Sequence, residues 1–396
     1  MKHVPRKHIL LTGLAIFSML FGAGNLMYPL EVGMKTGSHY IIGLSGFIIT
    51  AVLLPLIGLV SMILFNGDVH HFFNRLGKPV GQTLLFLCIL VIGPLIGIPR
   101  IVTLSHTMIS PFLPGGFFTQ AGIMPPLIFS LIFLGITFLA TFRENKIVPI
   151  LGYVISPALL FSLLTIIIKG IYTAQTTILS TQSVGSLFSA SLISGYETLD
   201  LLGTIFFASI ILHILRNTLG DGIHNNTRLL ATVSLKSGVI GVFLLALVYV
   251  GMGIIGAYHG HSVNSMYVDT LFREISFAIL GICGAALIGT AVIMACLSTS
   301  IALSAVVAEY VEYTIFNKRL SFPVCLAIVL LSCVPLSIAG LGYVRAITAG
   351  PLLYIGYPVL ITLTLCNLAY KLWDIRSVKV PVLVTFLVTL VSYLTR

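Results

Sequence analysis

Apolar runs of membrane-spanning length recur along the whole chain and are separated by short polar stretches. The hydrocarbon core of a bilayer is about 30 Å thick and requires roughly 20 apolar residues per helix. The runs do not alternate apolar and polar positions as barrel strands do, so the pattern predicts an all-α, polytopic membrane protein. The predicted transmembrane helices number eleven and cover residues 9–36, 40–65, 81–110, 125–142, 147–168, 191–214, 232–257, 274–308, 322–341, 344–369 and 380–395.

The composition agrees with this pattern, because 58% of the 396 residues are hydrophobic and only 8% are charged. Most of the 21 Lys and Arg residues lie on one side when the N-terminus is placed in the cytoplasm, as the positive-inside rule requires. The net charge of +10 is spread over several short loops, which argues against nucleic-acid binding. We therefore expect a multi-pass protein of the cytoplasmic membrane with a cytoplasmic N-terminus.

The first apolar run contains the segment FGAGNLMYP, residues 21–29, which is a poor continuation for a membrane helix. A helix break within hydrocarbon persists only where protein, water, ion or ligand satisfies the unpaired backbone groups. Gly22, Ala23 and Gly24 would supply bare amides, and Asn25 could cap the half-helix that follows. A positive helix end facing a cavity attracts a carboxylate. The alternative is that these small residues only allow neighbouring helices to approach closely.

The sixth run contains ISGYETLDLLG, residues 193–203, which again combines glycine with polar residues. Paired interruptions in spans 1 and 6 predict an inverted repeat of five helices plus five, with a binding site at the two breaks. Acids inside a membrane helix are costly, so Glu197 and Asp200 should face a polar cavity. The alternative is that span 6 begins later and both acids are interfacial.

We therefore expect the whole chain, residues 1–396, to form a single transmembrane domain. Its first repeat covers about residues 9–168 and its second about residues 191–369. An extra helix at about residues 380–395 follows the second repeat.

Four segments together resemble the bacterial branched-chain amino acid carrier family, the BrnQ-type LIV:cation symporters, over about residues 8–395. They are FGAGNLMYP, GPLIGIPR (93–100), SGYETLD (194–200) and ACLSTS (295–300). The resemblance implies the LeuT-type fold of the amino acid-polyamine-organocation superfamily. It also implies uptake of leucine, isoleucine and valine, driven by Na⁺ or H⁺. Methionine is a further candidate, because a hydrophobic pocket separates side chains of similar size by only about 1–3 kcal/mol.

The resemblance also implies site residues in this chain. The substrate carboxylate is assigned to Gly22, Ala23, Gly24 and Asn25, and the ammonium group to the segment Gly195, Tyr196, Glu197 and Thr198. The sodium site is assigned to backbone carbonyls near Ser18 and Phe21, to Cys296, and to the hydroxyls of Thr299 and Ser300. Oxygen ligands suit a hard cation. The alternative for the two hydroxyls is bonding to carbonyls of their own helix.

Two further polar residues are candidates for coupling or gating. Asp200 lies in the second interruption, and Arg100 ends GPLIGIPR, whose prolines and glycines predict an irregular helix. The alternative for Arg100 is a side chain that snorkels to the membrane interface.

The chain departs from the family pattern in two places. Twelve spans are usual in the family, against eleven predicted here, and the ten-helix core is expected to be unaffected. A leucine is usual where Glu197 stands, which bears on the substrate range and the coupling ion. Glu197 has two candidate roles, a fixed anion for the ammonium group or a proton carrier, and we favour the first, with Na⁺ as the driving ion.

The other function classes are less well supported by the sequence. A membrane enzyme needs a nucleophile or metal motif, and neither HExxH nor GxSxG occurs. The six cysteines include no CxxC pair, so we expect no cofactor besides the coupling ion. The alternatives to Na⁺ symport are a proton-coupled symporter of broader neutral amino acids, a channel, or a non-transporting amino acid sensor. The expected partners are a small neutral amino acid and the lipid bilayer.

Overall fold

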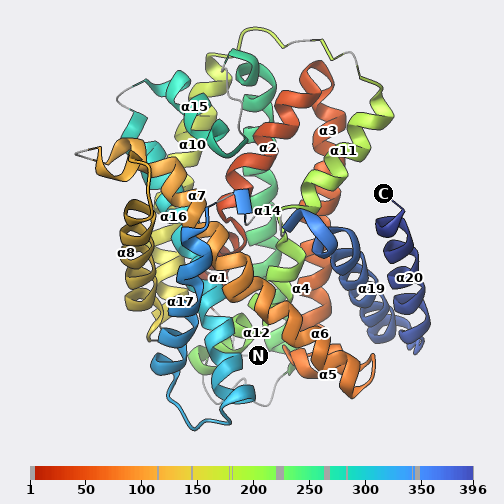
Figure 1. The fold of residues 1–396 in the computed structure, drawn as a ribbon. Helices are drawn as coiled ribbons and strands as arrows, with labels where there is room; N and C mark the ends of the chain where they lie inside the picture. Colours follow the sequence, from red (N-terminus) through yellow and green to blue (C-terminus); the bar gives the residue numbers. More distant parts are fainter. Residues whose placement is uncertain are drawn as a thin grey trace.

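The computed structural model describes residues 5–395 except 114–115, 144–145, 178, 181, 220–226, 263–267, 282–283, 341 and 344–347. Helices account for all the regular structure within these ranges, which confirms the all-α class. They form one bundle in which the long helices run roughly along a common direction (Figure 1).

The first span is broken, as the sequence predicts. Helix α1 (Arg6–Leu20) ends before Phe21, and α2 (Ala23–Thr36) begins after Gly22, whose backbone is extended at φ −99°, ψ −169°. A turn at Gly37, with φ +49°, then leads into the second span. That span consists of α3 (Tyr40–Ile48), a π-helical turn and α4 (Leu54–Leu64).

The sixth span is also broken, and it is longer than predicted. Helix α11 (Val184–Tyr196) and α12 (Asp200–Leu219) are separated by residues 197–199, so the span begins at Val184 rather than at residue 191. The serine-rich start of α11 hides this helix from a hydropathy reading. The hydroxyls of Ser189 and Ser191 donate to carbonyls one turn earlier, at 2.7 and 2.8 Å, which satisfies them inside the helix. The alternative of a late start with interfacial acids is therefore wrong.

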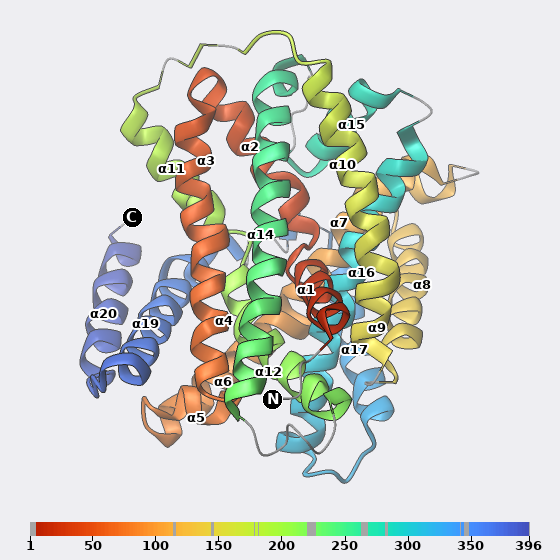
Figure 2. The same cartoon turned by 180° about the vertical axis from the view of Figure 1, so that it is seen from behind.

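Each broken span packs along one continuous span of the opposite half. Helices α1 and α2 both lie against α14 (Thr227–His259), whereas α11 and α12 lie against α3 and α4 (Figure 2). This exchange of partners is what an inverted repeat of five helices plus five produces. The residue limits of the two repeats stay predictions.

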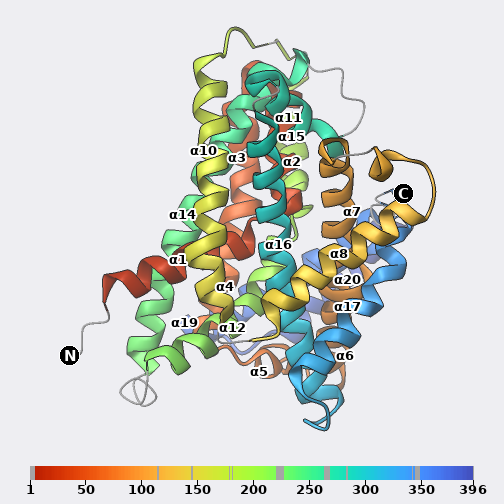
Figure 3. The ribbon, with the colours of Figure 1, turned by 90° about the vertical axis from the view of Figure 1, so that its left-hand side faces the viewer.

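The third span is irregular, as predicted from its prolines and glycines. Helix α6 (Lys78–Leu90) passes through a π-helical segment, Val91–Leu95, into α7 (Gly97–Ile109). Gly93 in that segment has non-helical angles of φ −91°, ψ −116°. Helix α7 packs against α16 (Ala285–Tyr310), which also contacts α8 (Met124–Thr141) and α17 (Phe322–Ile338) (Figure 3).

One predicted feature of the span list needs correction, and another cannot be compared. The eighth span does not start at residue 274. Helix α15 (Val268–Leu280) is followed by Gly281, which has φ +64°, and α16 is a separate helix. The first residues of the tenth predicted span, 344–347, lie outside the described residues. The remaining helices are α5 (Val69–Asn74), α9 (Ile147–Ile150), α10 (Ser156–Tyr172), α19 (Tyr357–Trp373) and α20 (Lys379–Leu394).

The count of eleven spans is not confirmed. Within the described residues, eight helical segments are long and apolar enough to cross a membrane, and α17 and α20 are shorter apolar helices. Part of the difference lies at the first span, since its two half-helices have only 15 and 14 residues. The stretch from α2 to α4 also enters the count of eight as a single segment despite the turn at Gly37.

Candidate functional site

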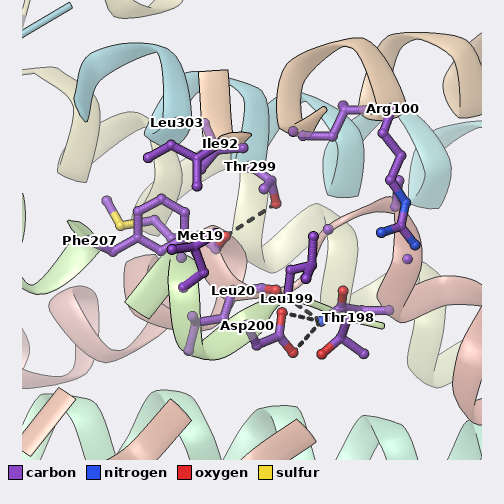
Figure 4. Close-up of a pocket in the computed structure, with 18 of the residues that line it drawn as sticks. Met19, Leu20, Ile92, Arg100, Thr198, Leu199, Asp200, Phe207, Thr299 and Leu303 are labelled. Carbon is purple, nitrogen blue, oxygen red and sulfur yellow. Dashed lines mark hydrogen bonds between the residues drawn. The ribbon is translucent and has the colours of Figure 1, made fainter. Parts of the chain in front are cut away.

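A cavity lies where the two broken spans meet, enclosed by α7 and α16 (Figure 4). Both breaks, the third span and the eighth span contribute to its wall. Its polar lining comes from the backbone of the first break and from Asn25, Arg100, Thr198, Asp200 and Thr299. Its apolar lining comes from Met19, Leu20, Val91, Ile92, Ile101, Leu199, Leu202, Phe207 and Leu303.

Asp200, the first residue of α12, ties the two breaks together. The Asn25 side-chain amide donates to its carboxylate oxygens at 2.9 and 3.1 Å, and the Tyr249 hydroxyl on α14 donates at 2.9 Å. The same amide also bonds the Tyr249 hydroxyl and the Leu20 carbonyl. Asp200 thus joins the start of α12 to the end of α1, the start of α2 and α14.

Besides these donors, Thr198 and Arg100 are the other polar residues near Asp200, and both line the same cavity. Asp200 is only 5% exposed, and within the described residues none of the ion pairs involves it. The start of α12 is held further by the Tyr357 hydroxyl, which accepts from the Leu201 amide at 3.2 Å. A carboxylate within a membrane span, bonded by neutral donors, is a functional-site candidate by default.

Arg100 on α7 reaches the second break and α2. Its guanidinium donates to the Glu197 carbonyl at 3.0 Å and to the Tyr28 hydroxyl at 2.6 Å. Arg100 is only 8% exposed, so the alternative of a side chain snorkelling to the interface is wrong. The guanidinium lies beside Gly24, where an added Cβ would come within 3.1 Å of its Nη2 atom. Arg100 therefore covers the start of α2 at one end of the cavity.

The first turn of α2 lines the cavity with glycine and alanine backbone. Gly22, Ala23 and Gly24 are all lining residues, and no side chain caps this helix start. The expected cap by Asn25 is wrong, because its amide instead reaches back to the Leu20 carbonyl at 3.0 Å. The helix start therefore keeps its positive end turned to the cavity.

The residues implied for sodium do not converge as a group. The Thr299 hydroxyl on α16 donates to the Met19 carbonyl at 3.2 Å, next to Gly22 (Figure 4). It bonds α1 rather than a carbonyl of its own helix. Ser300, one residue on, faces another neighbour, because its hydroxyl lies 3.2 Å from that of Thr137 on α8. Its implied place beside the break of α1 disagrees with this geometry, since successive helical residues point about 100° apart.

The other residues implied for sodium are buried around the same break. Ser18 bonds its hydroxyl back to the Ala15 carbonyl at 3.0 Å. Phe21 stacks on Phe17, with ring centroids 5.5 Å apart. Cys296 on α16 is fully buried. The carbonyl that meets Thr299 is that of Met19, which sequence reasoning did not identify.

Only some of the residues implied for the ammonium group lie at the cavity. Thr198 lines the cavity, and the Glu197 carbonyl accepts from Arg100. Gly195 instead packs α11 against the second span, because an added Cβ would overlap the Thr50 hydroxyl. Tyr196 lies beside Tyr357, with ring centroids 5.5 Å apart, and neither Gly195 nor Tyr196 is among the described lining residues.

Sequence reasoning missed the tyrosines of the site. Tyr249, Tyr28 and Tyr357 are buried and bond Asp200, Arg100 and the Leu201 amide respectively. A tyrosine inside an apolar span is a usable signal, since a buried phenol needs a hydrogen-bond partner.

The comparisons with known sequences agree on a family. The profile of the "Branched-chain amino acid transport protein" family matches residues 5–396. The branched-chain amino acid permease BraB of Bacillus subtilis is 28% identical over 381 residues, covering 95% of this chain and 83% of the permease. The branched-chain amino acid permease BrnQ of Lactobacillus delbrueckii subsp. lactis is 31% identical over 389 residues, with 95% and 84% covered.

Solved structures agree on the fold. MhsT in complex with L-phenylalanine superposes with a TM-score of 0.64 at 15% identity, covering 97% of this chain and 98% of MhsT. MHP1, a nucleobase-cation-symport-1 family transporter, gives 0.60 at 14% identity, with 96% and 91% covered. Both are transporters of the LeuT-type fold that the sequence predicts. The chain therefore belongs to the branched-chain amino acid transport protein family, and it is a multi-pass membrane transporter rather than an enzyme.

Proposed function

We propose that the protein imports leucine, isoleucine and valine, with methionine as a weaker substrate, across the bacterial cytoplasmic membrane by symport with Na⁺. The observation that carries this proposal is the cavity between the two broken spans, polar at the breaks and apolar along α7, α12 and α16. The cytoplasmic N-terminus follows from the positive-inside pattern and belongs to the same proposal.

The cavity has suitable groups for both ends of a zwitterion. The uncapped amides at the start of α2 suit the substrate carboxylate, because a helix N-terminus attracts an anion. The ammonium group needs acceptors, which the Thr198 hydroxyl and the Asp200 carboxylate supply across the cavity. Asp200 takes over the fixed-anion role that sequence reasoning gave to Glu197, which is not among the described lining residues.

The apolar wall suits a branched aliphatic side chain. Ile92, Ile101, Leu202, Phe207 and Leu303 offer no hydrogen-bonding side-chain groups, so a charged side chain would be desolvated there without a partner. A hydrophobic pocket separates neighbours that differ by one methylene by only about 1–3 kcal/mol. Leucine, isoleucine and valine should therefore compete with one another, whereas lysine and aspartate should not.

Thr299 and the Met19 carbonyl are the proposed core of the Na⁺ site. A hydroxyl and a carbonyl meet there at the broken end of α1, and oxygen donors of this kind suit a hard cation. An ion between them would link α1 to α16, and its binding would bias the arrangement of the first break that also forms the substrate site. Substrate and ion would then raise each other's affinity reciprocally.

A second candidate is proton coupling through Asp200, favoured by the burial of this carboxylate and its neutral partners. The experiment that separates the two is uptake of radiolabelled leucine into proteoliposomes under an imposed Na⁺ gradient and, separately, an imposed H⁺ gradient. Accumulation driven by Na⁺ at equal pH on both sides supports the proposal. Accumulation driven only by H⁺ would reject it in favour of Asp200. Large passive flux without saturation would indicate a channel.

A further inference from the structure

A deep apolar groove lies away from the proposed substrate site, between α6 and α20 and against α19. Its volume is about 630 Å³. Its walls carry large apolar side chains, of which Val80 and Leu383 are each 57% exposed and Leu87 is 51% exposed. A soluble protein rarely exposes such a surface. On a membrane protein, an exposed apolar surface of this kind is suited to contact with lipid chains.

One end of the groove is basic. Lys379, the first residue of α20, lines the groove, and Lys78, the first residue of α6, directly precedes its lining residue Pro79. Both lysines are exposed, and neither appears in an ion pair within the described residues. The nearby acid Asp374 is already paired with Arg376, at 3.4 Å.

Arg75, which lies between α5 and α6, joins the segment before α6 to α19 and to the residues before α20. Its guanidinium donates to the Arg376 carbonyl at 2.9 Å and lies 3.8 Å from the centre of the Tyr370 ring. Asn367 on α19 accepts from the same guanidinium at 3.4 Å and donates to the Phe72 carbonyl at 3.0 Å. These contacts hold the segments that lead into α6 and α20 against the same helix, α19, next to the two lysines.

The stretch of α6 that lines the groove is about as long as one leaflet is thick. From Lys78 to Leu87 the chain advances nine residues along α6, which is about 13 Å at roughly 1.5 Å per residue. Half of a hydrocarbon core is about 15 Å. A hydrocarbon chain lying along this wall would therefore begin at the charged end and stop near the middle of the bilayer.

We propose that this groove binds an anionic phospholipid. One acyl chain lies along Val80, Leu84, Leu87, Leu383 and Phe386, and the phosphate group lies between Lys78 and Lys379. Basic pockets between transmembrane helices bind anionic lipid headgroups in this manner. The bound lipid would fill the space between α6 and α20 and hold these two helices together. Helix α6 continues through Val91–Leu95 into α7, which carries Arg100. The bound lipid would therefore also stabilise the α6 half of this span.

Native mass spectrometry and thermal unfolding of the full chain purified in mild detergent test this site. Phosphatidylglycerol, phosphatidylcholine and inorganic phosphate are added separately. We expect phosphatidylglycerol to bind near one molecule per protein and to raise the unfolding midpoint. The zwitterionic phosphatidylcholine should bind more weakly, and phosphate, which has no acyl chain, should leave the midpoint unchanged. Equal binding of the two phospholipids would overturn the proposal.

Paired variants locate the site. Lys78→Ala with Lys379→Ala should weaken phosphatidylglycerol binding about 25-fold, because each basic side chain near a membrane surface contributes about a fivefold factor. The matched control, Lys236→Ala with Lys318→Ala, makes the same charge change away from the groove and should bind as the wild type does. Val80→Trp, which fills the groove and keeps both lysines, should also lose the lipid. If the double lysine variant or Val80→Trp binds phosphatidylglycerol as the wild type does, the site is rejected. If mass spectrometry shows a dimer of the wild type that only Val80→Trp loses, the groove binds a second copy of the chain instead.

Discussion

The two helix breaks meet at one cavity but are constructed differently. The first, at Phe21 and Gly22, is fully enclosed and is followed by Ala23 and Gly24, so it offers backbone amides. The second, residues 197–199, is half-buried and contains no glycine or alanine. Leu199 there has φ +61°, a left-handed conformation that is uncommon for residues other than glycine.

The two breaks also differ in how their shape is maintained. The first keeps its shape because small residues let Thr299 and Arg100 approach the backbone, at 3.0 and 3.1 Å from the positions of added Cβ atoms on Gly22 and Gly24. The second is held by hydrogen bonds from other helices. Arg100 donates to the Glu197 carbonyl, and the Tyr357 hydroxyl accepts from the Leu201 amide. We therefore expect the first break to be sensitive to added bulk and the second to be sensitive to loss of polar contacts.

Bulk at Gly24 should have the largest effect. The side chain of Gly24→Val would meet the Arg100 guanidinium and the Tyr28 ring, at 3.1 and 3.2 Å from its Cβ, and would cover the amides proposed for the carboxylate. We expect no leucine uptake above background in proteoliposomes that contain normal amounts of protein. Gly135→Val on α8 is the matched control, since no atom lies within 4 Å of the added Cβ. Wild-type uptake by Gly24→Val would remove the carboxylate from this break.

Replacement of Asp200, which links the two breaks, should have the second-largest effect on leucine uptake. Asp200→Asn keeps the size of the side chain but removes the charge that Asn25 and Tyr249 share. Asn retains one acceptor oxygen and places an N–H group where the other oxygen stood, so at least one of these bonds is lost. A hydrogen bond to a charged group contributes about 1.5–3 kcal/mol, which corresponds to a decrease of roughly 10- to 150-fold in leucine uptake. Uptake is measured beside Tyr249→Phe, which removes one donor and should lose less activity. If Asp200→Asn accumulates leucine normally, the carboxylate holds neither substrate nor coupling ion.

The cation site predicts a smaller change that is confined to the first break. Thr299→Ala removes the hydroxyl at the Met19 carbonyl, and we expect the Na⁺ concentration for half-maximal uptake to rise about tenfold, equivalent to roughly 1.4 kcal/mol. Ser300→Ala removes a hydroxyl that faces Thr137 instead and should leave the Na⁺ dependence near that of the wild type. Equal shifts in both variants would restore the sodium site implied by sequence resemblance, and no shift in either would favour H⁺.

How much of the site the sequence predicts depends on which break is considered. The first break was predicted because glycines and a proline in an apolar run are a local signal that needs no knowledge of neighbouring helices. The position of the second break was predicted from Gly195, Glu197 and Asp200, but its contacts come from Tyr249, Arg100 and Tyr357, which are distant in the chain. The hydroxyl of Ser300 faces Thr137 rather than the first break, because adjacency in sequence does not place two helical side chains on the same face. Its role at the sodium site stays a prediction.

Replacement of Glu197 should have the smallest effect and decides whether the second break acts through its backbone or through this side chain. The backbone carbonyl of Glu197 accepts a hydrogen bond from Arg100. Glu197→Gln and Glu197→Leu both retain this carbonyl. The cavity-lining carboxylate of this break is Asp200, so we expect both variants to transport leucine within about twofold of the wild type, because Glu197 acts in this site through its backbone carbonyl. Uptake is measured between pH 5.5 and 8, because a proton carrier at Glu197 would give a flattened profile in both variants. Weaker leucine binding in Glu197→Gln with an unchanged profile would instead return the fixed-anion role to Glu197, and Asp200 would then serve mainly to hold the two breaks together.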